Sequence, residues 1–353
     1  MPGKGKLRIA VLYDPADNTG TPPPEGRVHH KERRRPGTRR WRGRERRQKE
    51  DREHVAEALR ACGYDSFLHE VRDEASLLAL AKTDADLIFN MVEAYAGDDS
   101  REPQVAGFLD LLELRYTGAG PQALFLAQDK ALAKKIFDFH GIRTPRFASS
   151  YRGKLDHVDD LEFPVIVKPG SEDGSVGIDA GAVVRTVREL MERISMIQER
   201  FDSPALIEEY IEGREMYVGV LGNEKPVALP VVELDLSKLP EGMPKIAGRE
   251  VKWDKGTEAY DLTRSAAAKD LDEDVARRLQ SIALQVCSAL RLRDYGRVDM
   301  RLTPEGQIYV IEANPNPWLA PEAELAIAAA LAGRSYAELI GQIVELALAR
   351  YAA

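Results

Sequence analysis

The stretch from Arg293 to Trp318 constrains the fold most, because it places acids on two strands that must pair. Residues 299–302 lead into a turn at 303–306, and an apolar strand returns from there. This pairing would bring Asp299 beside Glu312 and Asn314, with Arg297 as the apparent counter-charge. Like charges in a partly buried site need a cation between them, and Mg²⁺ prefers carboxylates together with phosphate oxygens. We therefore expect a magnesium site; a hairpin with its acids in water is the alternative.

The charge of the chain is concentrated in one basic segment. The 353 residues are 44% hydrophobic, enough for a large core in two or three domains, and the net charge is −8. Residues 27–52 hold thirteen Arg and Lys against four acids, so they carry +9 and the remainder carries −17. Segment 27–49 has too few apolar residues to fold alone. It is either a polyanion-binding arm or a solvated insertion, and Trp41 is its only aromatic residue.

The cysteines and the hydrophobic runs bear on location. Cys62 and Cys287 are too few for a disulfide framework, and both lie in apolar helical patterns, which predicts buried thiols in a reducing compartment. The first hydrophobic run, 7–13, has only the length of a strand, and no run approaches a membrane span. We therefore expect a cytoplasmic protein without a membrane segment.

Strand and helix patterns alternate up to Gly118, which predicts a parallel α/β sheet. The polar loop at 90–104 follows the carboxyl end of a strand, where ligands bind in such sheets. Glu93 and Arg101 are its candidates for a substrate contact. Capping of the next helix by Ser100 or Asp99 is the alternative reading of this loop.

Lysines stand out in the middle of the chain. Lys130 and Lys134 share one helix face and suit a phosphate or a purine edge, although surface lysines would look the same. The strand at 163–169 contains Lys168, whose ammonium cannot be buried easily without an anion. The Gly- and Ser-rich loop that follows offers backbone N–H groups to phosphate, or is a flexible connector.

A possible nucleotide hinge follows at the end of the strand 205–211. Its backbone would read an adenine edge while Glu215, in the next strand, accepts from ribose hydroxyls; solvated acids at a strand end are the alternative. The hinge residues are Glu208, Glu209, Tyr210 and Ile211. Further on, Lys252 and Trp253 lie in a polar stretch that could form a lid.

These motifs resemble the ATP-grasp superfamily, and within it the D-alanine–D-alanine ligase group. The resemblance extends from about Thr117 to the C-terminus and rests on VIVKPGSEDGSVGI, ALIEEYIEGREMYV, YGRVDMRL and YVIEANPNP, in this order. It implies a mixed α/β, ATP-grasp fold with an N-terminal parallel α/β domain at 1–122, a central domain at 123–206 and a catalytic domain at 207–353. It also implies the joining of a carboxylate to an amine through an acyl phosphate, with ATP and Mg²⁺ or Mn²⁺.

The resemblance assigns roles to the residues singled out above. Lys134 and Lys168 would contact the nucleotide phosphates and base. Residues 208–211 and Glu215 would hold adenine and ribose. The catalytic group would be Arg297 and Lys252 at the transferring phosphate, with Ser175 in the lid. The metal ligands would be Asp299, Glu312 and Asn314, the last of these also facing the nucleotide.

Departures from the family pattern concern the substrates. Asp14 and the basic insertion stand where the family has a glycine-rich loop and an acid that holds the first ammonium. Ala323 falls about where a serine would bind the acceptor's carboxylate, with Glu322 and Glu324 on either side. This change predicts a cationic or amide-bearing acceptor. The candidate substrate residues are Glu93, Arg101, Trp253, Trp318 and Glu322, of which Trp253 replaces a family tyrosine and Trp318 a glycine.

We therefore expect a ligase of small-molecule carboxylates and amines, amino acids or peptides, whose natural pair is not two D-alanines. One alternative is a nucleotide-dependent nucleic-acid binder that uses segment 27–49. Another is a phosphotransferase that stops at an acyl or alkyl phosphate. The helical tail from residue 323 predicts core packing, with a homodimer face as the alternative.

Overall fold

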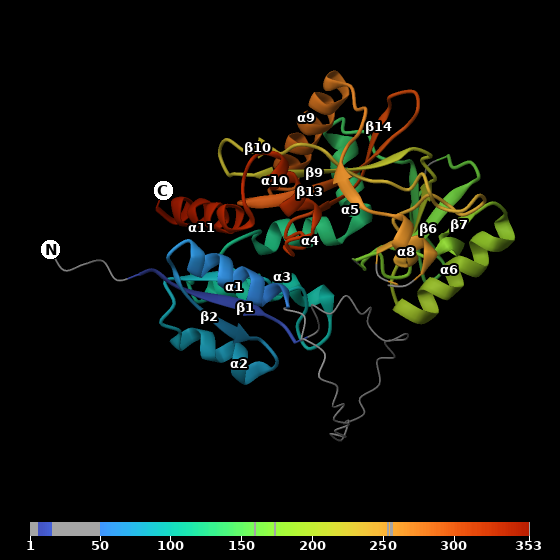
Figure 1. Ribbon diagram of the computed structural model, residues 1–353. Coiled ribbons are helices and arrows are strands. Elements are labelled where there is room, and N and C mark those ends of the chain that lie inside the picture. Colours follow the sequence, from blue (N-terminus) through green and yellow to red (C-terminus); the bar gives the residue numbers. More distant parts are fainter. Residues whose placement is uncertain are drawn as a thin grey trace.

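Three β-sheets organise the part of the chain that the structure describes. The computed structural model describes residues 6–15, 50–158, 160–172, 174–252, 254 and 257–352. One sheet is parallel and two are antiparallel, and helices accompany each of them (Figure 1). This arrangement confirms the mixed α/β class. The basic segment 27–49 and Trp253 lie outside the described residues.

The N-terminal sheet is parallel, as the alternating pattern predicted. β1 (Arg8–Tyr13) lies between β2 (Asp65–Glu70) and β3 (Leu87–Asn90). Its alternate residues enter two different cores, Ile9 and Val11 on one side and Ala10 and Leu12 on the other, which explains its continuous apolar sequence. The helices of this unit are α1 (Asp51–Ala61), α2 (Glu74–Ala79), η1 (Leu80–Lys82), η2 (Asp99–Arg101) and α3 (Glu102–Leu111).

The central sheet is antiparallel, in the order β5-β4-β8-β6-β7. Helix α6 packs on it through Ile197, which shares a core with Val165 and Val167. The expected border between residues 206 and 207 falls within β8. The elements are α4 (Pro121–Gln128), α5 (Lys130–Phe139), β4 (Phe147–Tyr151), β5 (Lys154–Val158), β6 (Val165–Pro169), η3 (Ala180–Ala182), β7 (Val183–Val184), α6 (Val187–Phe201) and β8 (Ala205–Glu209).

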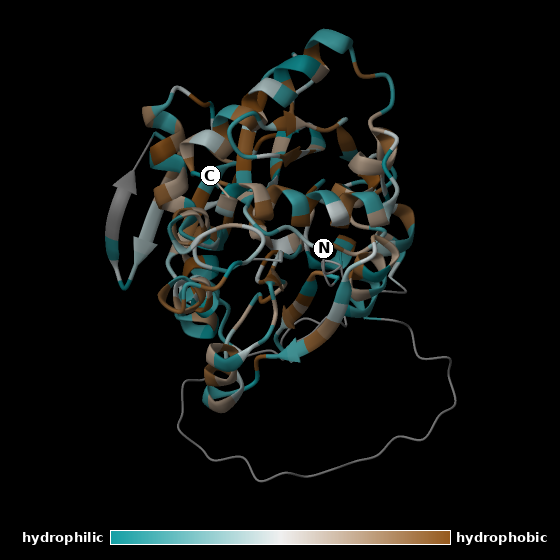
Figure 2. Ribbon diagram, turned by 90° about the vertical axis from the view of Figure 1, so that its left-hand side faces the viewer, coloured by the Kyte–Doolittle hydropathy of each residue, from teal (hydrophilic) through white to brown (hydrophobic). Residues whose placement is uncertain are grey.

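The C-terminal sheet is antiparallel, in the order β12-β11-β9-β13-β14, and β10 pairs with β9. Helix α9 covers one face of it through Leu279 and Ala283, which lie in one core with Met216 and Met300. Figure 2 shows how hydrophobic and hydrophilic residues alternate along the helices. The elements are β9 (Arg214–Leu221), β10 (Val227–Ala228), β11 (Val232–Leu234), α7 (Arg249–Lys252), α8 (Glu258–Leu262), β12 (Ser265–Ala267), α9 (Glu273–Ala289), β13 (Tyr295–Leu302), β14 (Ile308–Asn314), α10 (Glu324–Leu331) and α11 (Tyr336–Ala352).

Helix α11 returns to the N-terminal unit and packs on α1 (Figure 1). Leu339 and Ile343 share a core with Leu59, so the tail packs in the interior as expected. The prediction for the cysteines was half wrong. Cys287 is buried, but Cys62 is exposed, because it follows the last turn of α1 at the edge of this contact.

Candidate functional site

One face of the C-terminal sheet carries charged side chains, and we call it the charged face. Residues directly opposite each other on paired strands project to the same side, and alternate residues project to the other. The alternate residues, such as Val218 and Val298, join the core beneath α9. The charged face consists of Glu215, Tyr217 and Gly219 on β9, Arg297, Asp299 and Arg301 on β13, and Glu312 and Asn314 on β14. Asp299 lies opposite Glu312, as the hairpin predicted, and Asn314 lies opposite Arg297.

A β-bulge in β14 turns Glu312 toward the charged face. Asp299 is opposite Glu312, whereas the next residue of β13, Met300, is opposite Val310, so Ile311 is the extra residue. In a regular strand, Val310 and Glu312 would project to the same side. The bulge lets Val310 enter the core while Glu312 stays among charged groups.

Arg297 is held by two carboxylates. Its Nε and Nη2 donate to the two oxygens of Asp299 at 2.7 and 2.9 Å, and its Nη1 donates to Oε2 of Glu324, the first residue of α10, at 3.1 Å. The guanidinium lies 5.1 Å from the ring centroid of Tyr217, and Nζ of Lys252 lies 5.7 Å from the same ring. Burial alone would lower the pKa of Arg297, but the two carboxylates raise it well above its usual value. The guanidinium therefore stays charged.

Glu312 has more cations around it than the hairpin sequence indicated. Its Oε2 lies 3.7 Å from Nζ of Lys130. Burial would raise the pKa of Glu312, but Lys130, Lys168, Lys252 and Arg297 together lower it to about 2. Arg297 is a counter-charge as expected, but three lysines were missed, because α5, β6 and α7 each bring one to this side of β14.

A buried cluster of two lysines and one glutamate, the Lys–Glu cluster, joins α5 to the central sheet. Nζ of Lys134 and of Lys168 lie 2.5 and 2.6 Å from the two carboxylate oxygens of Glu208, and the three side chains are at most 4% exposed. Lys134 also donates to Oγ1 of Thr144 at 2.7 Å. The anion that burial of Lys168 requires is therefore Glu208. Burial lowers the pKa of Lys134 to about 8, whereas the two lysines outweigh burial and lower that of Glu208.

The expected nucleotide hinge connects the two antiparallel sheets. The N–H of Glu209 donates to the carbonyl of Arg146 at 2.9 Å, and the N–H of Tyr210 donates to that of Pro164 at 3.3 Å. Ile211 is buried between β8 and β9. This segment is thus fixed by its backbone to the edge of the central domain.

Glu215, the expected ribose ligand, is already paired in the protein. Its Oε2 lies 2.7 Å from Nε of Arg301. Arg301 also donates to the carbonyls of Gly213 and Lys245, at 2.9 and 2.6 Å. A ribose contact by Glu215 would therefore share this carboxylate with Arg301.

The first loop expected to form a lid contacts the segment that precedes the second one. Oγ of Ser175 donates to the carbonyl of Ala247 at 2.7 Å, and the N–H of Arg249 donates to that of Ile178 at 2.8 Å. This contact holds α7, whose last residue is Lys252, over the charged face. Trp253 follows Lys252 but lies outside the described residues.

The substrate candidates of the N-terminal unit have partners of their own. The N–H of Glu93 donates to Oδ2 of Asp14 at 2.8 Å, and the Glu93 side chain is exposed. Arg101 is also exposed, and its Nε lies 3.1 Å from Oδ2 of Asp98. The next helix, η2, is capped by Asp98, whose side chain accepts from the N–H of Ser100. The expected caps were Ser100 and Asp99.

Trp318 connects the C-terminal unit to the N-terminal one. Its Nε1 donates to Oδ2 of Asp51, in the first turn of α1, at 2.5 Å. Asn316 supports the same junction, since its Nδ2 donates to Oε1 of Glu102 at 3.0 Å. Glu322 is exposed. The structure therefore gives Trp318 an interdomain contact, and a substrate contact by Trp318 or Glu322 stays a prediction.

The sequence reasoning missed Tyr217. Its hydroxyl is buried and has no hydrogen-bond partner among the described residues, although Arg297 and Lys252 lie over its ring. Alternation from Glu215 would have placed it on the same face. Gly219, the next residue on this face, was missed as well: a Cβ there would come within 2.5 Å of Leu325 in α10.

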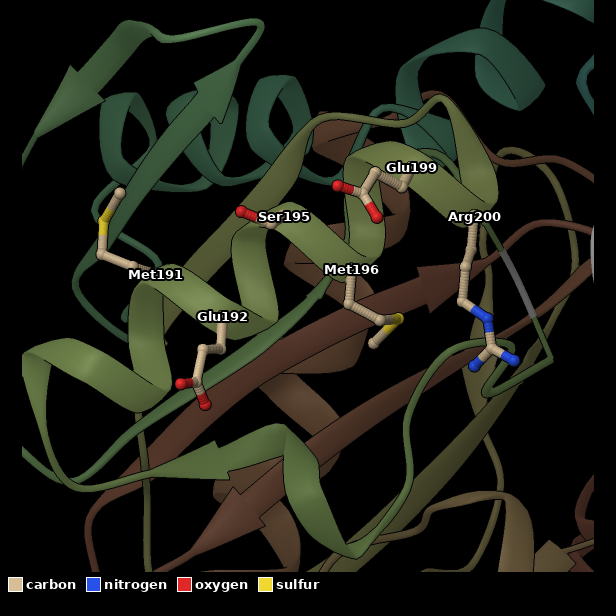
Figure 3. Close-up of a pocket in the computed structure, with 6 residues that line it drawn as sticks. All are labelled: Met191, Glu192, Ser195, Met196, Glu199 and Arg200. Atoms are coloured by element: carbon tan, nitrogen blue, oxygen red, sulfur yellow. The ribbon is translucent and has the colours of Figure 1, made fainter.

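A surface hollow on α6 lies elsewhere and has no part in this site. It measures about 550 Å³ and is lined by residues of α6 alone (Figure 3). The lining residues are Met191, Glu192, Ser195, Met196, Glu199 and Arg200. Five of them are exposed, whereas Met196 is half-buried and packs, like Ile197, with the core of the central sheet.

Comparisons with known proteins agree with this architecture. The family "D-ala D-ala ligase C-terminus" matches residues 130–345, more than half of the chain. The chain is 31% identical to the D-alanine–D-alanine ligase of Aquifex aeolicus, over 82% of this chain and 92% of that protein. It is 34% identical to the y4sG protein of Sinorhizobium fredii, over 84% and 87% of the two chains.

The chain belongs to the D-alanine–D-alanine ligase family. It is therefore an ATP-dependent ligase that forms carbon–nitrogen bonds. The D-alanine–D-alanine ligase from Bacillus anthracis complexed with ATP shares the ATP-grasp fold, with a TM-score of 0.70 over 97% of both chains at 21% identity. The described part of the chain contains no helix that is both long and apolar enough to cross a bilayer.

Proposed function

We propose that this member of the D-alanine–D-alanine ligase family activates a carboxylate with ATP at the charged face and joins it to an amine other than D-alanine. The observation that carries the proposal is the approach of Lys130, Lys168, Lys252 and Arg297 to Glu312, which brings four cations from four elements to one place. Phosphoryl transfer depends mainly on positioning and charge neutralisation, and this arrangement supplies both.

The Lys–Glu cluster and the hinge are the proposed nucleotide site. Lys134 and Lys168 would contact phosphate and base, and Glu208 would accept from the adenine amino group. Residues 209–211 would present their backbone to the adenine edge, and Glu215 would accept from the ribose. Both lysines are committed to Glu208 in the structure, so nucleotide binding would redistribute these contacts.

Asp299, Glu312 and Asn314 fit a magnesium ion. Carboxylate and amide oxygens are the hard donors that Mg²⁺ prefers. Nδ2 of Asn314 is buried without a hydrogen-bond partner in the described residues, so this amide can donate to a phosphate oxygen while its Oδ1 faces the metal. The described part of the chain contains no group of three or more His, Cys, Asp or Glu side chains that could hold a metal alone. Phosphate oxygens would therefore have to complete the coordination shell of the Mg²⁺. Bound there, Mg²⁺ would neutralise charge on the transferring phosphate.

The proposed reaction has two steps. A carboxylate oxygen of the first substrate attacks the γ-phosphorus of ATP, the bond to the β-phosphate oxygen breaks, and ADP leaves. The amine nitrogen of the second substrate then attacks the acyl carbon, inorganic phosphate leaves with the bonding pair, and the amine loses a proton to solvent. Arg297 would hold the transferring phosphate through the N–H bonds that Asp299 and Glu324 do not use. Ser175 and Lys252, in the two loops proposed as a lid, would exclude water from the labile acyl phosphate.

The test is ADP release by the full-length protein with ATP, Mg²⁺ and a panel of amino acids, peptides and polyamines. We expect turnover with a pair other than two D-alanines and loss of turnover in Lys168→Met. The matched control is Lys82→Met, which changes an exposed lysine of η1. Efficient turnover with D-alanine alone would refute the substrate part. Product mass distinguishes an amide from the acyl or alkyl phosphate of a phosphotransferase.

A further inference from the structure

The surroundings of Arg297 determine which acceptor can approach the acyl phosphate. All three nitrogens of its guanidinium donate to carboxylates, two to Asp299 and one to Glu324. Arg297 is thus shared between two acids. An acceptor with a free carboxylate would bring a third negative charge beside Asp299 and Glu324.

Glu324 lies beside Arg297 as an ionised acid. Its side chain is 16% exposed, its Oε1 accepts from Oγ of Ser265 at 3.0 Å, and its Oε2 accepts from Arg297. Burial would raise the pKa of Glu324, but Arg297 and Lys252 lower it overall, so the group is charged at neutral pH. The preceding residue, Ala323, is buried and offers no side-chain donor for a carboxylate.

We propose that Glu324 is a specificity-determining residue that selects an amine acceptor whose α-carboxyl group is neutral, such as an amino-acid amide. This inference rests on the proposed function, because it places the acceptor beside the phosphate that Arg297 holds. The negative charge of Glu324 attracts the acceptor's ammonium before it loses its proton, and it repels a free carboxylate next to it. A neutral amide at the same position brings no charge to be repelled.

Binding to the full-length protein saturated with Mg²⁺ and a non-hydrolysable ATP analogue tests this inference without turnover. Calorimetry would compare glycinamide with glycine and D-alaninamide with D-alanine. We expect each amide to bind the wild type at least about 10-fold more tightly than its acid, since like charges side by side cost on the order of 1 kcal/mol or more. In Glu324→Gln, which keeps the shape and a hydrogen-bonding oxygen, this preference should fall to within about 2-fold.

Two further variants make the outcome decisive. Glu305→Gln removes an exposed acid at the hairpin turn and should leave the preference unchanged. An unchanged affinity of Glu324→Gln for the ATP analogue would show that the variant is folded. Equal binding of acid and amide to the wild type, no binding of either, or a preference that moves in Glu322→Gln and not in Glu324→Gln would each overturn the inference. Failure of the proposed function would appear separately, as no ADP release with any pair in the panel.

Discussion

Glu208 is the residue on which the Lys–Glu cluster depends. It is the carboxylate between two buried ammonium groups, and no other acid approaches Lys134 or Lys168 as closely among the described ion pairs. Glu208→Gln would take from two buried ammonium groups the carboxylate that they both contact. We expect it to lower the free energy of unfolding by about 3–5 kcal/mol, measured by urea denaturation.

The neighbouring glutamate provides the control for this change. Glu209 is 30% exposed and lies 3.7 Å from Arg146, so Glu209→Gln should cost less than about 1 kcal/mol. Equal losses in the two variants would contradict the reading of Glu208 as a buried counter-charge.

The burial of Lys134 predicts how ATP binding depends on pH. Burial lowers its pKa to about 8 in the free protein, and a bound phosphate would raise it again. The nucleotide-bound protein should therefore hold more protons near pH 8 than the free protein, so ATP binding takes up protons there. Affinity should fall as the pH rises through 8, because the uncharged amine no longer attracts phosphate.

Calorimetry in two buffers of different ionisation enthalpy measures this proton uptake directly. Lys134→Met should remove the uptake that the wild type shows. A proton release, or the same uptake in the variant, would mean that Lys134 does not meet the nucleotide.

At the scale of elements, α10 packs closely on β9 because Gly219 of β9 has no side chain. A Cβ on Gly219 would lie 2.5 Å from Cδ1 of Leu325, so Gly219→Ala must move the Leu325 side chain or shift α10, which also carries Glu324, the partner of Arg297. We expect a loss of stability of about 1–3 kcal/mol and a lower kcat. Thermal unfolding and the ADP-release assay would measure the two effects.

Gly107 offers a matched change in α3. Its Cβ would meet nothing closer than 3.9 Å, so Gly107→Ala should be neutral or stabilising by up to about 1 kcal/mol. If both substitutions behaved alike, the position of α10 would not depend on the contact between Gly219 and Leu325.

The hairpin shows how far the sequence can predict this site. The turn at 303–306 was enough to place the strand that carries Asp299 beside the strand that carries Glu312. The bulge at Ile311 was not predictable, because the alternation of Val310 and Glu312 gives no sign that an extra residue reverses their sides. The lysines around Glu312 come from distant segments, and only tertiary packing assembles them. Lys168 shows the same limit: the need for an anion was visible, but the identity of that anion, Glu208, was not.

At the scale of the whole molecule, the proposed ligands tie the central sheet to the C-terminal one. Lys168 and Glu208 belong to the first of these sheets, and Glu312 and Asn314 belong to the second. A nucleotide with Mg²⁺ would bridge them and stabilise both. At 100 times its Kd, an ATP analogue with Mg²⁺ should raise the free energy of unfolding by about 2.7 kcal/mol.

Chelation supplies the control for this prediction. With EDTA, the same analogue concentration should stabilise much less, because the phosphates would face Asp299 and Glu312 without a cation between them. A Tm shift that does not depend on Mg²⁺ would show that the proposed site does not use the metal.

The contact between α1 and α11 has a consequence for how the protein matures. The thiol of Cys62 reaches the carbonyl of Ala337, 275 positions further along the chain, and Leu59 is covered by residues of α11. During translation the first sheet is made early and covers part of the apolar side of α1, but the part that packs on α11 has no cover until residues 336–352 have been made. Until then the nascent chain exposes apolar surface on α1, and exposed apolar surface is what chaperones bind.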